Sequence, residues 1–309
     1  MTPGQTLRLG TRRSALAQTQ SRHVAAALEA AHPGLSVRLV PVVTEGDRKP
    51  GDLTPVGGKG LFTRELEEGL EAGDLDLAVH SLKDLPARFS DALVLAAYPE
   101  RVDPRDVLVS ESSSSLDDLA EGAVLLTGSQ RRKAQILARR PDLRVEPIRG
   151  NVETRIRKWR RSRAEGLILA AAGLSRLGLE GVPIHPVDPD RMIPAPGQGV
   201  LAVQVLRNSP AEELCRALDH PPTARAARAE RALVTAFGGD CTLPFGAWAR
   251  EAREQELRLI AVLATPDGEL VARGEARGDD PEAVATECLE NMRRDGVEEV
   301  LDRLGHRIP

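Results

Sequence analysis

The order in which short apolar runs alternate with segments of helical period restricts the possible folds of this chain more than any other feature. Residues 7–10 predict a strand, residues 15–31 a helix capped by Ser14, and residues 35–43 a second strand. The same order continues with a helix over 61–72, strands over 75–80, 107–110, 123–127, 143–148 and 167–171, and helices after Ser115 and over 130–140 and 152–163. Such alternation predicts parallel sheets covered by helices.

The pattern changes after Pro221-Pro222 and predicts a separate α+β domain. This part of the chain predicts a helix over 223–237, strands near 245–250, 256–264 and 269–275 with a hairpin turn at 266–268, and two closing helices. The turn-rich stretches 101–106 and 192–199 are the expected crossovers between two α/β lobes. The fold class expected is therefore α/β with a smaller α+β domain at the C-terminal end.

Composition excludes several classes of protein. The chain has 309 residues, 41% of them hydrophobic and 28% charged, which argues against disorder, collagen and a disulfide-stapled miniprotein. The first residues contain no signal-like apolar run, and no stretch is long enough to span a bilayer, so we expect a soluble, cytoplasmic protein. Cys215, Cys241 and Cys288 are widely spaced, which supports neither a disulfide framework nor a metal site. Cys215 and Cys288 are expected in the core.

Positive charge is concentrated in one segment. Only 5 of the 42 basic residues are lysine, an imbalance that codon bias or heat adaptation also produces. Between residues 131 and 163, however, 13 basic residues face three acidic ones, which predicts an anion site. Several of these residues have the spacing of outward helix positions: Arg139, Arg140, Arg157, Arg160, Arg161 and Arg163.

Four arginines of this segment lie instead at strand-to-helix turns. Arg131 and Arg132 follow Thr127-Gly128-Ser129, and Arg149 and Arg155 flank the next such turn. Free backbone N–H groups, hydroxyls and guanidinium groups at such turns can converge on one anion. A nucleic-acid-binding module is the competing interpretation, but aromatic residues make up only 2% of the chain, which provides little for base stacking.

Two further stretches carry reactive side chains. His80-Ser81-Leu82-Lys83-Asp84 follows a buried strand, and a capped turn with a surface Lys–Asp pair explains it about as well as a functional edge does. His80 by itself is better explained as a packed residue. Cys241 lies in a loop between a helix and a strand, where a thiol can be exposed. The glycine-rich stretch 44–60 predicts a long binding loop.

Taken in order, these motifs resemble those of the porphobilinogen deaminase (hydroxymethylbilane synthase) family. The resemblance runs nearly end to end through residues 11–17 (TRRSALA), 57–62 (GGKGLF), 78–84 (AVHSLKD), 103–106 (DPRD), 131–132 (RR), 149–155 (RGNVETR), 172–178 (AGLSRLG), 196–199 (PGQG) and the loop around Cys241.

The resemblance implies a three-domain transferase. Two lobes like those of periplasmic binding proteins, residues 1–100 with 200–218 and residues 101–199, would surround a cleft, and residues 222–309 would form the domain that carries the cysteine. The family condenses four porphobilinogen molecules head to tail, releases ammonia at each step, and frees the linear tetrapyrrole hydroxymethylbilane by hydrolysis. Its primer is a dipyrromethane cofactor, whose thioether carries over to Cys241.

The resemblance also assigns roles to individual residues. Asp84 would be catalytic, its carboxylate stabilising the cation that forms when porphobilinogen loses ammonia. The residues implied to hold the cofactor are Cys241, Ser81, Lys83, Asp84, Thr127, Ser129, Arg131, Arg132 and Arg155. Those implied to hold the substrate are Arg12, Ser14, Lys59, Phe62, Arg149, Arg155, Arg176 and Gln198. Arginine suits both tasks because each pyrrole ring carries two carboxylates.

Two positions depart from the family pattern. Pro55 stands where a basic residue is common, and Asp240 replaces the glycine usual before the cysteine. A non-catalytic two-lobe anion-binding protein remains the alternative, and it predicts no covalent adduct on Cys241. The expected state is a monomer that binds neither nucleic acid nor membrane and could hand its product to the next enzyme of tetrapyrrole synthesis.

Overall fold

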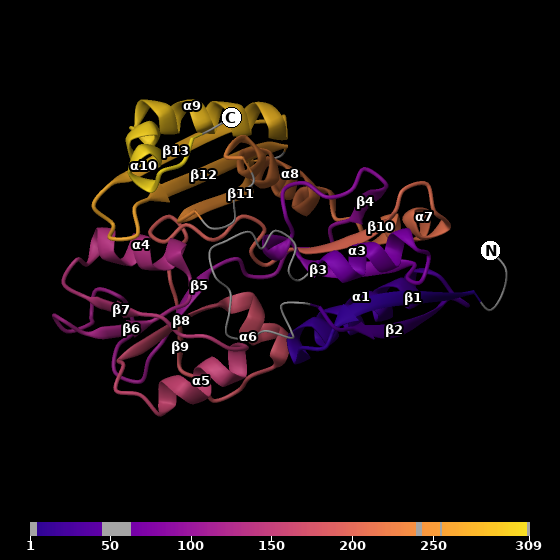
Figure 1. The fold of residues 1–309 in the computed structure, drawn as a ribbon, viewed down its shortest axis with the longest axis horizontal. Coiled ribbons are helices and arrows are strands. Elements are labelled where there is room, and N and C mark those ends of the chain that lie inside the picture. The colour runs from indigo at the N-terminus through magenta and orange to yellow at the C-terminus, as the bar shows by residue number, and fades with distance from the viewer. Residues whose placement is uncertain (1–4, 45–62, 239–242, 254, 308–309) are drawn as a thin grey trace. The chain divides into compact units, whose positions relative to one another are not determined.

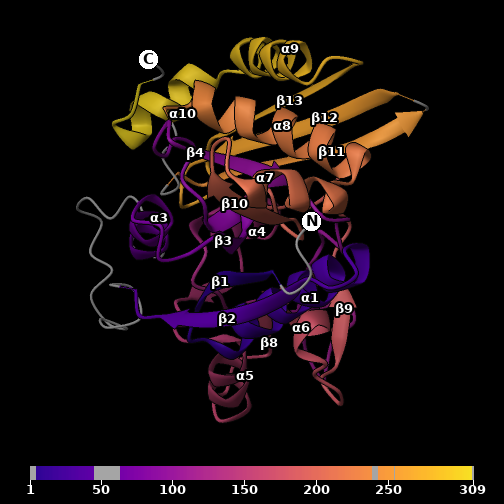
Figure 2. The same ribbon diagram turned by 90° about the vertical axis from the view of Figure 1, so that its right-hand side faces the viewer.

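A computed structural model of the chain describes residues 5–44, 63–238, 243–253 and 255–307. These residues divide into two compact units. The first unit contains residues 1–102 and 200–224, and the second contains residues 103–199 and 225–309. Figures 1 and 2 show the elements of both units.

The first unit is built on one mixed five-stranded sheet in the order β2-β1-β3-β10-β4. Its strands are β1 (Thr6–Arg12), β2 (Ser36–Val42), β3 (Leu77–Ser81), β4 (Leu93–Ala97) and β10 (Leu201–Leu206). Its helices are α1 (Ala15–Ala31), α3 (Arg64–Glu71), α7 (Pro210–Cys215) and the short 3-10 turns η1 (Leu82–Asp84) and η2 (Arg216–Leu218). Alternate strand residues bury both faces: Leu77 packs with α1 and α7, whereas Ala78 packs with α3.

The second unit contains a similar sheet in the order β7-β6-β8-β5-β9. Its strands are β5 (Asp106–Val109), β6 (Val124–Leu126), β7 (Arg144–Glu146), β8 (Gly166–Ala170) and β9 (Ile184–Pro186). Its helices are α4 (Gln130–Arg139), α5 (Val152–Arg160) and α6 (Ala171–Leu177). Ile136 of α4 is buried against one set of strand residues, and Trp159 of α5 is buried against the alternate set.

The second unit also holds a three-stranded antiparallel sheet in the order β11-β12-β13. Its strands are β11 (Phe245–Arg253), β12 (Glu256–Ala264) and β13 (Val271–Gly278), and its helices are α8 (Pro221–Ala236), α9 (Pro281–Arg294) and α10 (Val297–Leu304). The three helices cover one face of the sheet and share one apolar core with it (Figures 1 and 2). Together with the two mixed sheets, this domain confirms the predicted fold class.

The strand directions differ from those predicted. β10 runs antiparallel to β3 and β4, and β5 runs antiparallel to β8 and β9, so both large sheets are mixed rather than parallel. The alternation of helices and strands in the sequence does not determine whether a strand runs parallel or antiparallel to its neighbours in the sheet. β4, β9 and β10 are strands that the apolar periodicity did not single out.

The helix predicted after Ser115 is absent from the described segment 111–121, which forms bends instead. Serine hydroxyls there accept hydrogen bonds from nearby backbone N–H groups. Ser110 Oγ accepts from the N–H groups of Ser112 and Ser113, and Ser115 Oγ accepts from the N–H of Asp118. The turn around Ser110 competes with a helix, whereas the Ser115 bond has the geometry of a helix cap that no helix follows.

Two other observations bear on the expectations from sequence. None of the helices in the described ranges is long and apolar enough to cross a membrane. Cys215 and Cys288 are both buried, as predicted for core residues, and burial raises the pKa of each thiol to about 12. The three-domain division, with its cleft, stays a prediction.

Candidate functional site

The carboxyl edge of the first sheet brings together several predicted site residues. β1 and β3 are parallel, with Gly10 opposite Ala78, so Arg12 at the end of β1 lies level with His80 on β3. Ser81 ends β3, and Lys83 and Asp84 follow in the turn η1. Hydroxyl, ammonium, guanidinium and carboxylate groups therefore share one edge.

The turn that carries Asp84 is held by the sheet and by α1. The N–H of Leu82 donates to the carbonyl of Val200 at 3.0 Å, and Leu82 is buried. Gln20 Nε2 of α1 donates to Ser81 Oγ at 2.9 Å. The Asp84 side chain itself is exposed, and within the described ranges its carboxylate has no hydrogen-bond or ion-pair partner. The anchored turn thus presents a carboxylate that is available to a ligand.

Ser14 has a local structural task. Its Oγ accepts from the N–H of Ala17 at 3.3 Å and caps α1, as the sequence predicted. The cap fixes where β1 ends and α1 begins, and so fixes the backbone around Arg12. Whether Ser14 also contacts substrate stays a prediction.

A buried arginine pair is the most highly organised feature of the second unit. Arg131 Nη1 donates to Asp106 Oδ2 at 2.8 Å and to the carbonyl of Ile193 at 2.6 Å. Arg132 Nη2 donates to Asp106 Oδ1 at 2.8 Å, and its Nη1 donates to the carbonyl of Ile168 at 3.0 Å. Gln198 Nε2 also donates to Asp106 Oδ1, at 2.8 Å. Three side chains thus meet on one carboxylate.

The charge balance of this cluster is uneven. Asp106 is completely buried, and each arginine is only 5% exposed. Burial opposes ionisation of Asp106, but the charges and hydrogen bonds of Arg131 and Arg132 outweigh it and hold the pKa of that carboxyl well below its usual range. Two guanidinium groups and one carboxylate leave a net charge of +1 in a nearly dry place.

The topology explains how these residues meet. β5 is antiparallel to β8, with Asp106 opposite Ala170, so the first residue of β5 lies where β8 ends. α4, which carries both arginines, follows β6, and β6 is parallel to β8. The predicted gathering of arginines at the carboxyl ends of strands is therefore observed for this pair, although the carboxylate they meet belongs to the chain itself.

The hydroxyls at the start of α4 also have local partners. Ser129 Oγ accepts from the N–H of Arg132 at 3.4 Å as the helix cap, and Thr127 Oγ1 accepts from the N–H of Ser129 at 3.2 Å. Gly128 is required between them, because a Cβ at this position would lie 2.7 Å from the carbonyl oxygen of Ile148. This turn aims the first residues of α4 at Asp106.

The other predicted arginines of this unit lie at neighbouring turns. Arg155 Nε donates to the carbonyl of Gly150 at 2.7 Å, and Asn151 caps α5 by accepting from the N–H of Thr154 at 2.8 Å. Arg149 is exposed. Arg176 of α6 donates to the carbonyl of Gly199 at 2.8 Å, and burial lowers its pKa to about 10, so it remains charged near neutrality.

The six arginines predicted as an outward, solvated face are not all alike. Five of them are exposed: Arg139, Arg157, Arg160, Arg161 and Arg163. Arg140 is half-buried and was wrongly placed among them: it pairs with Asp142 at 2.6 Å and donates to the carbonyls of Leu116 and Leu119. The absence of a helix in segment 111–121 leaves these carbonyls free to accept from it.

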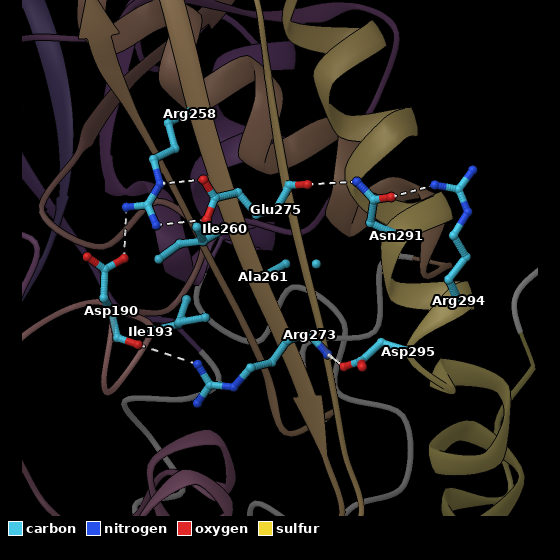
Figure 3. A pocket seen from close by; sticks show the side chains of 11 residues that line it. Asp190, Ile193, Arg258, Ile260, Ala261, Arg273, Glu275, Asn291, Arg294 and Asp295 are labelled. Atoms are coloured by element: carbon cyan, nitrogen blue, oxygen red, sulfur yellow. Dashed lines mark hydrogen bonds and ion pairs between the residues drawn. The ribbon is translucent and has the colours of Figure 1, made fainter.

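A pocket of about 580 Å³ lies elsewhere in the second unit, between residues 190–193 and the face of the β11-β12-β13 sheet (Figure 3). Its arginines already have protein partners: Arg258 pairs with Asp190 and Glu275 at 2.8 Å, and Arg294 donates to Asn291 Oδ1 at 2.9 Å. None of the predicted site residues that the structure describes lines this pocket. Within the described ranges, no group of three or more His, Cys, Asp or Glu side chains is arranged to hold a metal ion.

Comparison with known proteins identifies the family of this chain. The family described as "Porphobilinogen deaminase, dipyromethane cofactor binding domain" matches residues 7–213, and "Porphobilinogen deaminase, C-terminal domain" matches residues 224–294. The chain belongs to the porphobilinogen deaminase family. The porphobilinogen deaminase of Rubrobacter xylanophilus is 48% identical over 295 residues, which cover 95% of each chain. That of Bacillus velezensis is 40% identical over 309 residues, which cover 98% of each. Among solved structures, the methionine-binding protein MetQ matches 70% of this chain and 89% of its own with 14% identity and a TM-score of 0.43.

The residues present fit the dipyrromethane cofactor that the matching porphobilinogen deaminase domain is named for. A ligand that brings carboxylates complements a buried cluster with a net positive charge, and the Arg131–Arg132 pair supplies that cluster. Cys241, Lys59 and Phe62, which the family resemblance assigns to cofactor and substrate, lie outside the described residues. So does most of the glycine-rich stretch 44–60.

The sequence analysis did not single out the residues that hold the predicted site residues in position through hydrogen bonds. Asp106 appeared only as the last member of a family motif, although a charged residue that opens an apolar run was a usable signal. Gln135 gave no signal, yet it bonds both the N–H and the carbonyl of Ile193, at 2.8 and 3.0 Å, and so fixes an acceptor of Arg131. Gln20 gave none either.

Proposed function

We propose that this chain acts as a hydroxymethylbilane synthase. It joins four porphobilinogen molecules head to tail on a dipyrromethane primer bound to Cys241, releases ammonia at each step, and frees hydroxymethylbilane by hydrolysis. Membership of the porphobilinogen deaminase family over both of its domains carries the proposal. The buried arginine pair supports it independently, because this pair suits a ligand that carries carboxylates.

The arginines are proposed to bind and orient the carboxylates of the cofactor and of the substrate. Arg131, Arg132 and Arg155, with Thr127, Ser129, Ser81 and Lys83, are proposed to hold the cofactor carboxylates. When bound, the dipyrromethane supplies the pyrrole end to which new rings are joined. Arg12, Arg149, Arg155 and Arg176, with Ser14, Lys59, Phe62 and Gln198, are proposed to hold the incoming and growing chain. Guanidinium groups suit this work because each makes paired, charge-assisted hydrogen bonds to a carboxylate.

Asp84 is proposed as the catalytic residue. Loss of ammonia from porphobilinogen leaves a cation, and a carboxylate aimed at the pyrrole N–H groups stabilises the positive charge as it develops. The exposed Asp84 carboxylate, on a turn anchored to Val200 and Gln20, is suited to this role because no other described group competes for it.

The finer assignments concern partners and location. Porphobilinogen is the proposed substrate. The protein is proposed to work as a cytoplasmic monomer, without nucleic acid or membrane, and to hand its product to the next enzyme of tetrapyrrole synthesis.

Intact-mass measurement of the purified protein, before and after incubation with porphobilinogen, tests the proposal. The expected result is a covalent dipyrromethane adduct, a pyrrole colour with Ehrlich's aldehyde reagent, and release of ammonia. Cys241→Ser should fold but carry no adduct, whereas Cys215→Ser, at a buried cysteine, should keep it. A wild-type chain that never gains mass or releases ammonia would favour the non-catalytic anion-binding alternative.

A further inference from the structure

The carboxylate of Asp106 is a shared acceptor at the centre of the buried arginine pair. It receives Arg131 Nη1 at 2.8 Å, Arg132 Nε at 3.1 Å, Arg132 Nη2 at 2.8 Å and Gln198 Nε2 at 2.8 Å. Asp106 is completely buried and opens a strand whose four residues are all buried. Its position is therefore set by the sheet, and the positions of the two guanidinium groups are set by Asp106.

The hydrogen bonds to Asp106 leave part of each arginine available. Arg131 has five N–H groups, and two of them are on Nη1. One of these two donates to Asp106 and the other to the carbonyl of Ile193. Within the described ranges its Nε and Nη2 groups have no partner. Counting described partners only, Arg132 keeps one unused N–H on each Nη atom. Asp106 and two backbone carbonyls thus hold the pair, and its remaining donors have no partner among the described residues.

The net charge of the cluster formed by Asp106, Arg131 and Arg132 also favours an anionic ligand. Asp106 is the one acidic partner of the two guanidinium groups in the part of the chain that the structure describes, so one of their charges is not neutralised there. Burial together with the Arg132 charge lowers the pKa of Arg131. An uncompensated charge in a nearly dry place is costly. A single ligand carboxylate on the open side would balance the cluster.

We propose that Asp106 is a positioning residue, which locks Arg131 and Arg132 into one orientation and sets the cluster to receive one carboxylate of the bound cofactor. This inference rests on the proposed function and adds to it a residue that has no contact with the ligand. Asp106 acts only through the two arginines.

Chemical rescue tests the proposal. Asp106→Ala removes the carboxylate and leaves a space of its size lined by the donors of Arg131, Arg132 and Gln198, into which formate fits. The full-length purified variant is incubated with porphobilinogen, with and without formate, and the dipyrromethane-loaded fraction is followed by intact mass. Loading should be roughly 30-fold slower than in wild type or worse, since a buried charge partner has been truncated. Formate should restore it, whereas chloride should not.

Two variants serve as controls. Asp103→Ala removes a carboxylate three residues away that pairs with the exposed Arg105 at 2.7 Å, and it should load like wild type with or without formate. Asp106→Asn keeps the shape but not the charge and leaves no space, so it should load slowly and gain nothing from formate. It also serves as the test variant if Asp106→Ala does not fold.

Three results would overturn the proposal. The first is loading of Asp106→Ala or Asp106→Asn within about threefold of wild type, which is close to the error expected for independent sites. The second is slow loading of a folded Asp106→Ala that formate leaves unchanged, since a merely structural defect would behave in this way. The third is a wild-type chain that stays unloaded, which would overturn the proposed function and this inference together.

Discussion

At the scale of single residues, the most informative difference between expectation and structure concerns the anion that Arg131 and Arg132 meet. The turn chemistry predicted a bound anion, and the structure shows the carboxylate of Asp106, 25 residues before Arg131. Local spacing shows that two guanidinium groups begin a helix, but it does not show which distant strand ends beside them. Among the described residues, the one carboxylate of Asp106 therefore serves two guanidinium groups.

Asp84→Asn should lower turnover about 100- to 1000-fold, the usual cost of removing one electrostatic stabiliser of a developing charge. The fold and the covalent cofactor should persist, because the side chain is exposed and no described group depends on it. Single-turnover ammonia release on mass-verified protein measures the effect. Asp91→Asn, at another exposed aspartate of the same unit, is the matched control. A near-normal rate in Asp84→Asn would remove Asp84 from the mechanism.

The buried His80 should make stability depend on pH. Burial, and then the nearby charge of Arg12, lower its pKa from 6.5 to about 4. Between these values the unfolded chain binds a proton that the folded protein does not, so stability falls as pH drops from about 6.5 to about 4. The full loss is about 3 kcal/mol at 1.36 kcal/mol per pKa unit.

Urea unfolding at several pH values measures this effect. His80→Gln should show a shallower fall in stability across the same range, and His23→Gln, at an exposed position of α1, is the control. Equal pH slopes in His80→Gln and wild type would mean that other groups cause the acid sensitivity.

At the scale of elements, the contact between α9 and β13 depends on a missing side chain. A Cβ at Gly274 would lie 2.4 Å from the carbonyl oxygen of Cys288 and 2.6 Å from Met292 Cγ, so the backbone of α9 would have to shift. Gly274→Ala should therefore cost about 1–3 kcal/mol through overpacking. Gly278→Ala on the same strand meets only the tip of Val284, at 3.1 Å, and should cost less. Equal free energies of unfolding for the two variants would refute the close-approach argument.

Elements also show where local chemistry overrides periodicity. α1 begins and ends where its cap and apolar spacing predict, at Ala15 and Ala31. A helix is predicted after Ser115, but the described segment 111–121 forms bends, and Ser110 Oγ accepts from the N–H groups of Ser112 and Ser113.

At the scale of the whole molecule, ion pairs connect the two sheets of the second unit, the mixed sheet and the C-terminal antiparallel sheet. Arg258 of β12 is 15% exposed in its side chain and pairs with Glu275 and with Asp190, a residue that follows β9 (Figure 3). Its hydrogen bonds to Glu275 and Asp190 raise its pKa, so it stays charged at any physiological pH. Asp190 also accepts from Arg273 through its backbone carbonyl.

Arg258→Met should destabilise this unit by about 1–2 kcal/mol, more than an isolated surface pair, because a half-buried network of charge-assisted bonds is broken. Arg277→Met is the matched control: Arg277 pairs with the same Glu275 at 3.3 Å, but its side chain is 53% exposed, and it should change stability by less than about 0.5 kcal/mol. Chemical denaturation followed by the fluorescence of Trp248, which packs beside Ile193, reports on the junction. Equal free energies of unfolding for Arg258→Met and Arg277→Met would show that apolar packing alone holds the junction between the two sheets.

The sequence by itself determined the helices and strands that have clear periods and caps, the family, and the positions of the arginines at strand-to-helix turns. Each of these depends on neighbours within a few residues or on a motif read in order. Only the tertiary structure decided that β5 and β10 run against their neighbours, that Arg140 is half-buried, and that Asp106 lies between Arg131 and Arg132. These outcomes depend on which distant segments share a sheet, because burial leaves each donor only the acceptors that the fold brings to it.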